Sequence, residues 1–124
     1  MLFRSENIAG IVGMAQALEN ALIDMQEVSK RECYLRDKLF KELSTIPHSK
    51  INGDLVNRLP NNFNMCFEGI EGESLLLLLD DKGICASSGS ACTSGSLDPS
   101  HVLLAIGLPH EVAHGSLRRS EERR

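Results

Sequence analysis

Apolar residues recur at helical spacing over the first third of the chain, from Ile8 to Ile46. The positions that repeat are Ile8, Ile11, Val12, Ala15, Leu18, Leu22, Met25, Leu35, Leu39 and Leu43. Glu6 and Asn7 precede them, where an acidic and a capping side chain favour a helix start, and Pro47 favours its end. A straight helix of this length would be about 60 Å long, and polar residues 27–32 interrupt the apolar stripe. The pattern therefore predicts two helices, or one helix that bends near Asp24–Ser29.

After residue 46 the long helical pattern of apolar residues gives way to short segments with strand or helix patterns. Residues 63–67 alternate between apolar and polar, which predicts a half-buried strand. Residues 73–83 predict a short helix in which Gly83 provides the left-handed exit. Residues 84–87 and 115–118 are candidates for two further strands. Polar residues 119–124 are expected to fray.

Between the last two strand candidates lies a run of small residues, 87–96, that predicts a loop. A helix should follow, with Asp98 as its N-cap, Pro99 as its first residue and Gly107 at its exit. We expect His101 on this helix and both His110 and His114 in the loop after it.

These elements predict an α+β fold in a single domain, residues 1–124. A long N-terminal helix, bent or split, would pack with shorter helices on a three-stranded sheet. The length of 124 residues fits one domain. The loop of that domain that contains Cys92 would span residues 87–98.

Composition and charge exclude several classes of function. The formal net charge of −4 argues against nucleic-acid binding, which needs a basic surface. No apolar run reaches the length of a membrane span, and the N-terminus carries no secretory signal pattern. The four cysteines contain no CxxC pair, so we expect free thiols in a reducing, cytoplasmic setting.

Cys92 is the strongest candidate for chemistry. It lies among Ser, Gly, Ala and Thr, where no apolar neighbour in sequence would bury it, just before a predicted helix that would favour the thiolate. A free cysteine is more often a small core residue, and Cys33, Cys66 and Cys85 fit that interpretation better.

Three other patterns could indicate a functional site: a group of Cys and His residues, a glycine-containing loop and an arginine in a strand. Cys85, Cys92, His101 and His110 lack the spacing of a zinc site, so we expect surface histidines and no bound metal. Gly89 and Gly95 match no phosphate-binding motif and indicate a flexible connector. An arginine within a strand, Arg118, could bind a carboxylate or could be an edge-strand charge that discourages aggregation.

Residues 87–103 closely resemble the active-site cysteine segment of NifS/IscS-type cysteine desulfurases. Further segments resemble that family in the same order, and the similarity runs from Arg4 to Arg118. These segments are Asn52-Gly53, Arg58-Leu59-Pro60-Asn61-Asn62, Glu71-Gly72-Glu73-Ser74-Leu75 and Gly115-Ser116-Leu117-Arg118.

The resemblance implies a fold-type I pyridoxal-phosphate enzyme that converts cysteine to alanine, with the cofactor as electron sink. Cys92 would be the nucleophile that keeps the substrate sulfur as a persulfide. A scaffold protein for iron–sulfur cluster assembly, or another acceptor, would then receive that sulfur. Arg118 would hold the substrate carboxylate as a bidentate pair.

The chain also departs from the family. A full member is much longer, and its Schiff-base lysine segment (S-x-H-K-x-x-G) has no counterpart around Lys30, Lys38, Lys41, Lys50 or Lys82. Arg4-Ser5-Glu6-Asn7 lacks the threonine of R-S-G-T-E-N, which is expected to contact the cofactor phosphate. Arg119 replaces the apolar residue of S-[LI]-R-F-S-L-G.

We therefore expect a C-terminal small domain that holds no cofactor and is inactive alone. The alternatives are a sulfur-relay or interaction module that acts with a separate desulfurase, and a truncated fragment without function. The apolar stripe of the N-terminal helix predicts a homodimer, because a large domain that would cover it is absent.

Overall fold

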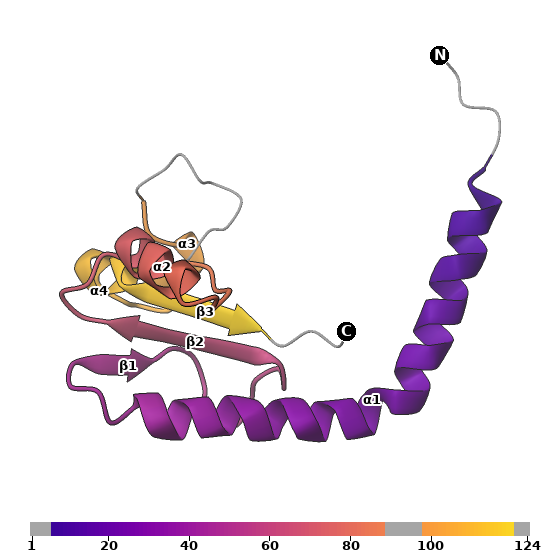
Figure 1. The fold of residues 1–124 in the computed structure, drawn as a ribbon, viewed down its shortest axis with the longest axis horizontal. Coiled ribbons are helices and arrows are strands. Elements are labelled where there is room, and N and C mark those ends of the chain that lie inside the picture. Colours follow the sequence, from indigo (N-terminus) through magenta and orange to yellow (C-terminus); the bar gives the residue numbers. More distant parts are fainter. Residues whose placement is uncertain (1–5, 89–97, 121–124) are drawn as a thin grey trace, which may run out of the picture.

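The computed structural model describes residues 6–88 and 98–120. Seven elements follow one another, and Figure 1 shows the helices on both sides of one sheet. They are α1 (Ile8–Leu43), β1 (Ser49–Ile51), β2 (Asn62–Phe67), α2 (Gly72–Asp81), α3 (His101–Ala105), α4 (His110–His114) and β3 (Ser116–Ser120). The predicted α+β fold with a three-stranded sheet is confirmed.

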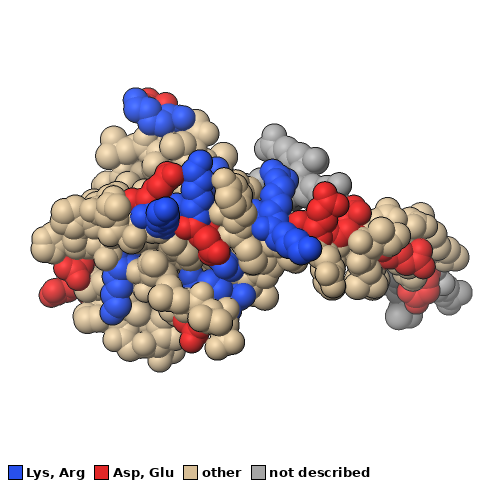
Figure 2. Space-filling view, turned by 90° about the horizontal axis from the view of Figure 1, so that it is seen from below, with Lys and Arg blue, Asp and Glu red and all other residues tan. Residues whose placement is uncertain are grey.

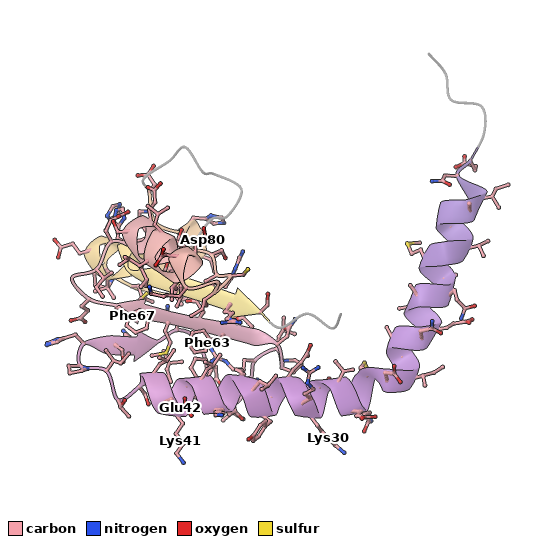
Figure 3. The ribbon with its side chains drawn as sticks, viewed as in Figure 1. Lys30, Lys41, Glu42, Phe63, Phe67 and Asp80 are labelled. Carbon is pink, nitrogen blue, oxygen red and sulfur yellow. The ribbon has the colours of Figure 1, made fainter. Side chains whose placement is uncertain are left out.

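The long N-terminal helix is one hydrogen-bonded element of 36 residues with a sharp bend, which Figure 1 shows as two arms. The side chain of Asn7 caps it by accepting a hydrogen bond from the backbone N–H of Gly10 at 3.0 Å. Figure 3 places Lys30 on the arm beside the sheet, so the bend comes earlier in the chain, in agreement with the predicted interruption. The helix ends at Leu43, four residues before Pro47.

The first arm of α1 lies away from the sheet. All residues from Glu6 to Ile23 are exposed, whereas Phe40 near the other end is buried. The apolar stripe therefore divides in two: its last members, Leu35, Leu39 and Leu43, are partly buried, and its first members lie in solvent.

The sheet has the order β1-β2-β3, and both pairs are antiparallel. Met65 pairs with Leu117, and Cys66 pairs with Ser116. Because successive side chains point to opposite faces, this register separates two cores. On the α1 face, Phe63, Met65, Phe67 and Leu117 cluster with Phe40. On the other face, Cys66 clusters with Leu103, Leu108 and Ala113 of the segment that contains α3 and α4.

Helix α2 begins one residue before and ends two residues before its predicted bounds, but the strand expected at residues 84–87 is wrong. Gly83 takes φ +71°, as predicted for the exit. The backbone N–H of Gly83 donates to Asp80, and that of Ile84 donates to Leu79, which is the hydrogen-bond pattern of a Schellman cap. The amide of Ile84 is thus used by the helix end, and only Ser87 makes an isolated bridge, to Arg118.

The C-terminal third differs from expectation at three places. Helix α3 begins at His101 with Ser100 as N-cap, not at Pro99 with Asp98 as N-cap. Residues 110–114 form helix α4 rather than a loop, so His110 and His114 are helical. Arg119 and Ser120 belong to β3, where they pair with Phe63 and Asn62, rather than to a frayed tail.

The surface in Figure 2 carries Lys and Arg interspersed with Asp and Glu over the sheet domain. On that face no broad basic stripe of the kind that binds nucleic acid is seen. Among the described residues, none of the helices has the length and apolarity that crossing a membrane would require.

Candidate functional site

Cys92, with Gly89 and Gly95, lies within residues 89–97, outside the described part of the chain. The described residues that flank this segment are nevertheless informative. Ser87 and Arg118 exchange two backbone hydrogen bonds, with N···O distances of 2.9 and 2.6 Å. Ser87, the last paired residue before the segment that contains Cys92, therefore lies beside β3, next to Arg118.

Arg118 lies in the middle of β3 and is half-buried. Its cross-strand neighbour is Asn64, so its side chain is on the face of Cys66 rather than the face of α1. Strand β3 is an edge strand of the sheet, and Ser87 satisfies its outer backbone groups at this one residue. Carboxylate binding and edge protection both remain predictions for Arg118.

A polar cluster lies beside Arg118 on the same face. The amide nitrogen of Asn52 donates to Oδ1 of Asn64 at 2.6 Å and to Sγ of Cys66 at 3.0 Å. Cys66 is fully buried, and this burial raises the pKa of its thiol, although the hydrogen bond from Asn52 opposes the shift. Cys66 is therefore held as a neutral thiol and has a structural role, as predicted.

Arg58 connects this cluster to α1. Its Nη2 donates to the carbonyl oxygen of Asn52, and its guanidinium carbon lies 4.6 Å from the centroid of the Phe40 ring. Nε and Nη1 of Arg58 are buried without a hydrogen-bond partner. Burial lowers the pKa of Arg58, and the nearby charge of Arg36 lowers it further.

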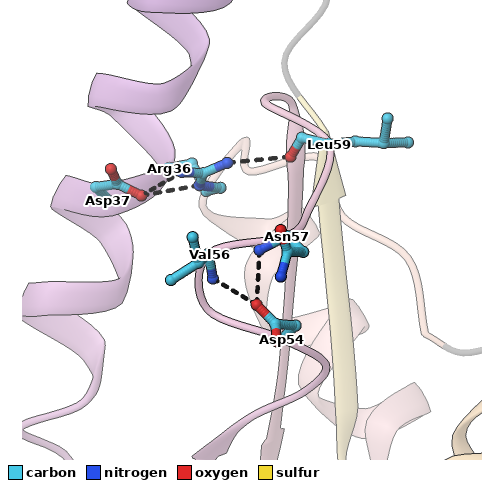
Figure 4. A network of polar contacts seen from close by, with 6 residues as sticks. All are labelled: Arg36, Asp37, Asp54, Val56, Asn57 and Leu59. Carbon is cyan, nitrogen blue, oxygen red and sulfur yellow. Dashed lines mark hydrogen bonds and ion pairs between the residues drawn. The ribbon is translucent and has the colours of Figure 1, made fainter.

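The loop between β1 and β2 is held by local hydrogen bonds, which Figure 4 shows. Asp54 accepts from the backbone N–H groups of Val56 at 2.7 Å and Asn57 at 2.6 Å. These two bonds lower the pKa of Asp54, and the bond from Asn57 has the larger effect. Arg36 reaches from α1 to the carbonyl oxygen of Leu59 at 3.1 Å, which ties the loop to the helix.

The two remaining cysteines that the structure describes, Cys33 and Cys85, differ in exposure. Cys33 is half-buried, as a core-facing cysteine would be, but Cys85 is exposed, so its predicted core role is wrong. Cys85 follows the α2 cap and takes no place in either core. In the described ranges, no group of three or more His, Cys, Asp and Glu side chains could hold a metal ion.

The lysines do not suit pyridoxal phosphate. A Schiff-base lysine needs a desolvated pocket that lowers its pKa, and all five lysines of the chain are exposed. Figure 3 shows Lys30 and Lys41 directed away from the sheet. The residues that the structure describes thus offer no attachment point for the cofactor, and we derive no step through it.

Sequence reasoning missed Asn52, Asn64 and Arg58 as members of this site. In the sequence, Asn52-Gly53 stands out only as a segment that resembles the desulfurase family, and in the structure Gly53 takes φ +81°. The burial of Asn52, at 4% exposure, could not be anticipated because turn residues are normally exposed. Its hydrogen bonds arise from strand pairing between segments that are separate in sequence.

Comparisons with known proteins agree with this architecture. The model of the aminotransferase class-V family matches residues 1–120. The chain is 55% identical over 116 residues to cysteine desulfurase IscS of Methanosarcina thermophila, covering 94% of this chain and 29% of that protein. It is 52% identical over 120 residues to cysteine desulfurase NifS of Azotobacter vinelandii, covering 96% and 30%.

Solved structures show the same fold. An X-ray structure of a NifS-like protein from Rickettsia africae superimposes with a TM-score of 0.82 at 28% identity, covering 97% of this chain and 31% of that one. Another NifS-like protein gives a TM-score of 0.81 at 33% identity, covering 96% and 29%. The chain spans about 30% of the length of the relatives that it matches. The resemblance drawn from the Cys92 segment is thereby confirmed, and the chain belongs to the aminotransferase class-V family.

Proposed function

We propose that this chain provides the sulfur-accepting, C-terminal portion of a cysteine desulfurase, with Cys92 as the thiol that carries sulfane sulfur. The observation that carries the proposal is the 17-residue segment 87–103, which resembles the active-site cysteine segment of that family. The relatives named cysteine desulfurase, at 52–55% identity, support it. Release of sulfur from cysteine would depend on pyridoxal phosphate bound outside this chain.

The described residues support a pairing of Cys92 with Arg118. Ser87, five residues before Cys92, is hydrogen-bonded to the backbone of Arg118. A substrate whose carboxylate binds the guanidinium of Arg118 would lie near the start of the Cys92 segment. Arg118 would thus position the substrate, and Cys92 would take its sulfur.

When a separate desulfurase delivers the sulfur to Cys92 as a persulfide, the transfer needs no redox partner. The thiolate of Cys92 attacks the outer sulfur of a donor persulfide, R–S–SH, and forms a new S–S bond. The donor S–S bond breaks, the electron pair leaves on the donor sulfur, and that sulfur takes up a proton as R–SH. Cys92 then holds the persulfide and can pass its outer sulfur to an acceptor, such as a scaffold for iron–sulfur cluster assembly, by the same exchange.

Mass spectrometry tests this role directly. The chain is mixed with an active desulfurase and cysteine, and we expect a gain of about 32 Da on the peptide that contains Cys92. Cys92→Ser should abolish the gain, and Cys85→Ser, which removes an exposed thiol, should retain it. An equal gain in Cys92→Ser would contradict the proposal.

A second measurement tests whether release of sulfur needs a separate cofactor domain. The chain alone, given pyridoxal phosphate and cysteine, should release no sulfide and show no absorbance of an internal aldimine. Sulfide release at enzymatic rates would refute the requirement for a separate cofactor domain. A sulfur-relay module would acquire and pass on sulfur only with a complete desulfurase, and a fragment without function would do neither.

We also propose that α1 mediates a homodimer. The first arm of α1 exposes large apolar side chains in a stripe, each more than half exposed: Ile8 (70%), Ile11 (52%), Val12 (61%), Leu18 (61%) and Leu22 (58%). Such a stripe commonly marks an interface, and a two-fold arrangement would bury it against itself. Light scattering at tens of micromolar should give a dimer mass, and Leu18→Glu should give a monomer mass. A monomer for the unmodified chain would refute the interface.

A further inference from the structure

The placement of His110 and His114 on one short helix gives them a relationship that a loop would not impose. His110 begins α4 and His114 ends it, so the two side chains are spaced i, i+4 on the same helical face. Their ring centroids lie 4.9 Å apart, with an angle of 64° between the ring planes. The two imidazoles are therefore direct neighbours.

This distance matches that of two imidazoles on a shared metal ion. Metal–nitrogen bonds of about 2.0–2.1 Å place the ring centroids about 4.5–5.2 Å apart when the two bonds form an angle of about 90–110°. The planes of the two rings are free to rotate about the metal–nitrogen bonds, so the 64° angle is compatible with chelation.

The surroundings also favour a cation. Glu71 directly precedes Gly72 at the start of α2, and this start lies against the end of α4: a Cβ on Gly72 would lie 2.7 Å from the carbonyl oxygen of His114. The carboxylate of Glu71 is already held by Ser74, with Oε2 2.6 Å from the hydroxyl oxygen. It therefore supplies negative charge close to the pair rather than a free ligand.

We propose that His110 and His114 form a two-histidine chelating site for a divalent transition-metal ion of the class that prefers imidazole, with water completing the coordination. No third His, Cys, Asp or Glu completes the site among the described residues, so the ion would bind reversibly at the surface. Neither histidine has a role in the sulfur chemistry proposed for Cys92.

Ni²⁺ is a suitable probe because it binds imidazole well. Softer metal ions would bind the cysteine thiolates as well. In a proton NMR titration of the chain, paramagnetic Ni²⁺ should broaden the ring signals of His110 and His114 first. The chain has four histidines, and the signals of His48 and His101, both exposed, serve as internal controls. Equal broadening of all four, or no broadening of the pair, would overturn the proposal.

Calorimetry with matched variants gives a second test. His110→Gln and His114→Gln should each weaken Ni²⁺ binding by about tenfold or more, because one of two protein ligands is lost. His101→Gln should bind like the unmodified chain. Binding that is unchanged in both single variants would contradict the chelate, and the NMR titration of the unmodified chain remains decisive if a variant folds poorly.

Discussion

The guanidinium of Arg58 lies over the ring of Phe40, with 4.6 Å between the guanidinium carbon and the ring centroid. Phe40 in turn stacks on Phe63, with 4.7 Å between ring centroids. A cation, a helix residue and a strand residue thus form one stack that fixes α1 to β2. The stack gives the guanidinium of Arg58 a favourable contact although two of its nitrogens are buried without a hydrogen-bond partner.

Replacing Arg58 with Ala should lower the free energy of unfolding by about 2 kcal/mol, because the stem packing, the cation–π contact and the bond to Asn52 are lost together. Urea unfolding followed by circular dichroism measures this change. Lys38→Ala, at an exposed position of α1, is the control and should change little. An equal loss in the two variants would remove the argument for the stack.

Gly115 should not tolerate a side chain. A Cβ at this residue would lie 2.0 Å from the carbonyl oxygen of Phe67 and 2.8 Å from that of Ile70, both backbone atoms. Gly115→Ala is therefore expected to cost about 3 kcal/mol or more. Gly13→Ala is the matched control: nothing lies within 4 Å, and alanine in a helix should raise stability by about 0.5–1 kcal/mol. A tolerated Gly115→Ala would show that the β2–β3 end can open.

The buried thiol of Cys66 should make the free energy of unfolding fall as the pH becomes alkaline. Burial raises the pKa of its thiol in the folded state, so above the pKa of the unfolded thiol the folded chain holds a proton that the unfolded chain has lost. Stability is therefore complete below the unfolded pKa of about 8.5 and falls above it, by up to about 1.4 kcal/mol per pH unit from this group. Urea unfolding from pH 7.5 to 10 should show a steeper decline for the unmodified chain than for Cys66→Ala. Parallel declines would mean that Cys66 is not the titrating group.

Replacing Arg119 with an aromatic residue should raise the stability of the domain. It lines a small cleft with Leu35, Leu39 and Phe63, and it pairs across the sheet with Phe63. Arg119→Phe would place an aromatic ring against apolar walls and should raise stability by about 1 kcal/mol. Ser120→Phe, one residue along on the opposite face, should give no such gain. A thermal melt compares the two, and a destabilised Arg119→Phe would show that the cleft cannot accept a ring.

Sequence patterns predicted the elements whose residues carry their own signal. Strand β2 shows alternation, α2 is a leucine run that ends in glycine, and the first half of α1 is preceded by a capping Asn7 whose side-chain bond the structure confirms. The bend of α1 followed from a polar interruption together with length.

The elements that were missed depend on contacts made elsewhere. Strand β1 is only three residues long and forms because Ser49–Ile51 pairs with β2. Helix α4 has five residues, too few for a period to be recognised, and Ala113 is buried against Cys66. The start of α3 was misplaced because Asp98, Pro99 and Ser100 all favour a helix start, and burial of Ser100 and Leu103 decided between them. The Cys92 segment was identified by resemblance, whereas the polar cluster around Asn52 required the fold.

Helix α1 is continuous in its hydrogen bonds, but only its second arm packs against the rest of the domain. The arm up to Ile23 is exposed throughout, whereas the arm that contains Phe40 lies on the sheet. An unsupported helix of this length is marginal in water, so in an isolated chain the first arm should exchange its amide protons through local fraying. The second arm should exchange only when the whole domain unfolds. One element of secondary structure would then comprise two cooperative units, and association with a partner would merge them into one.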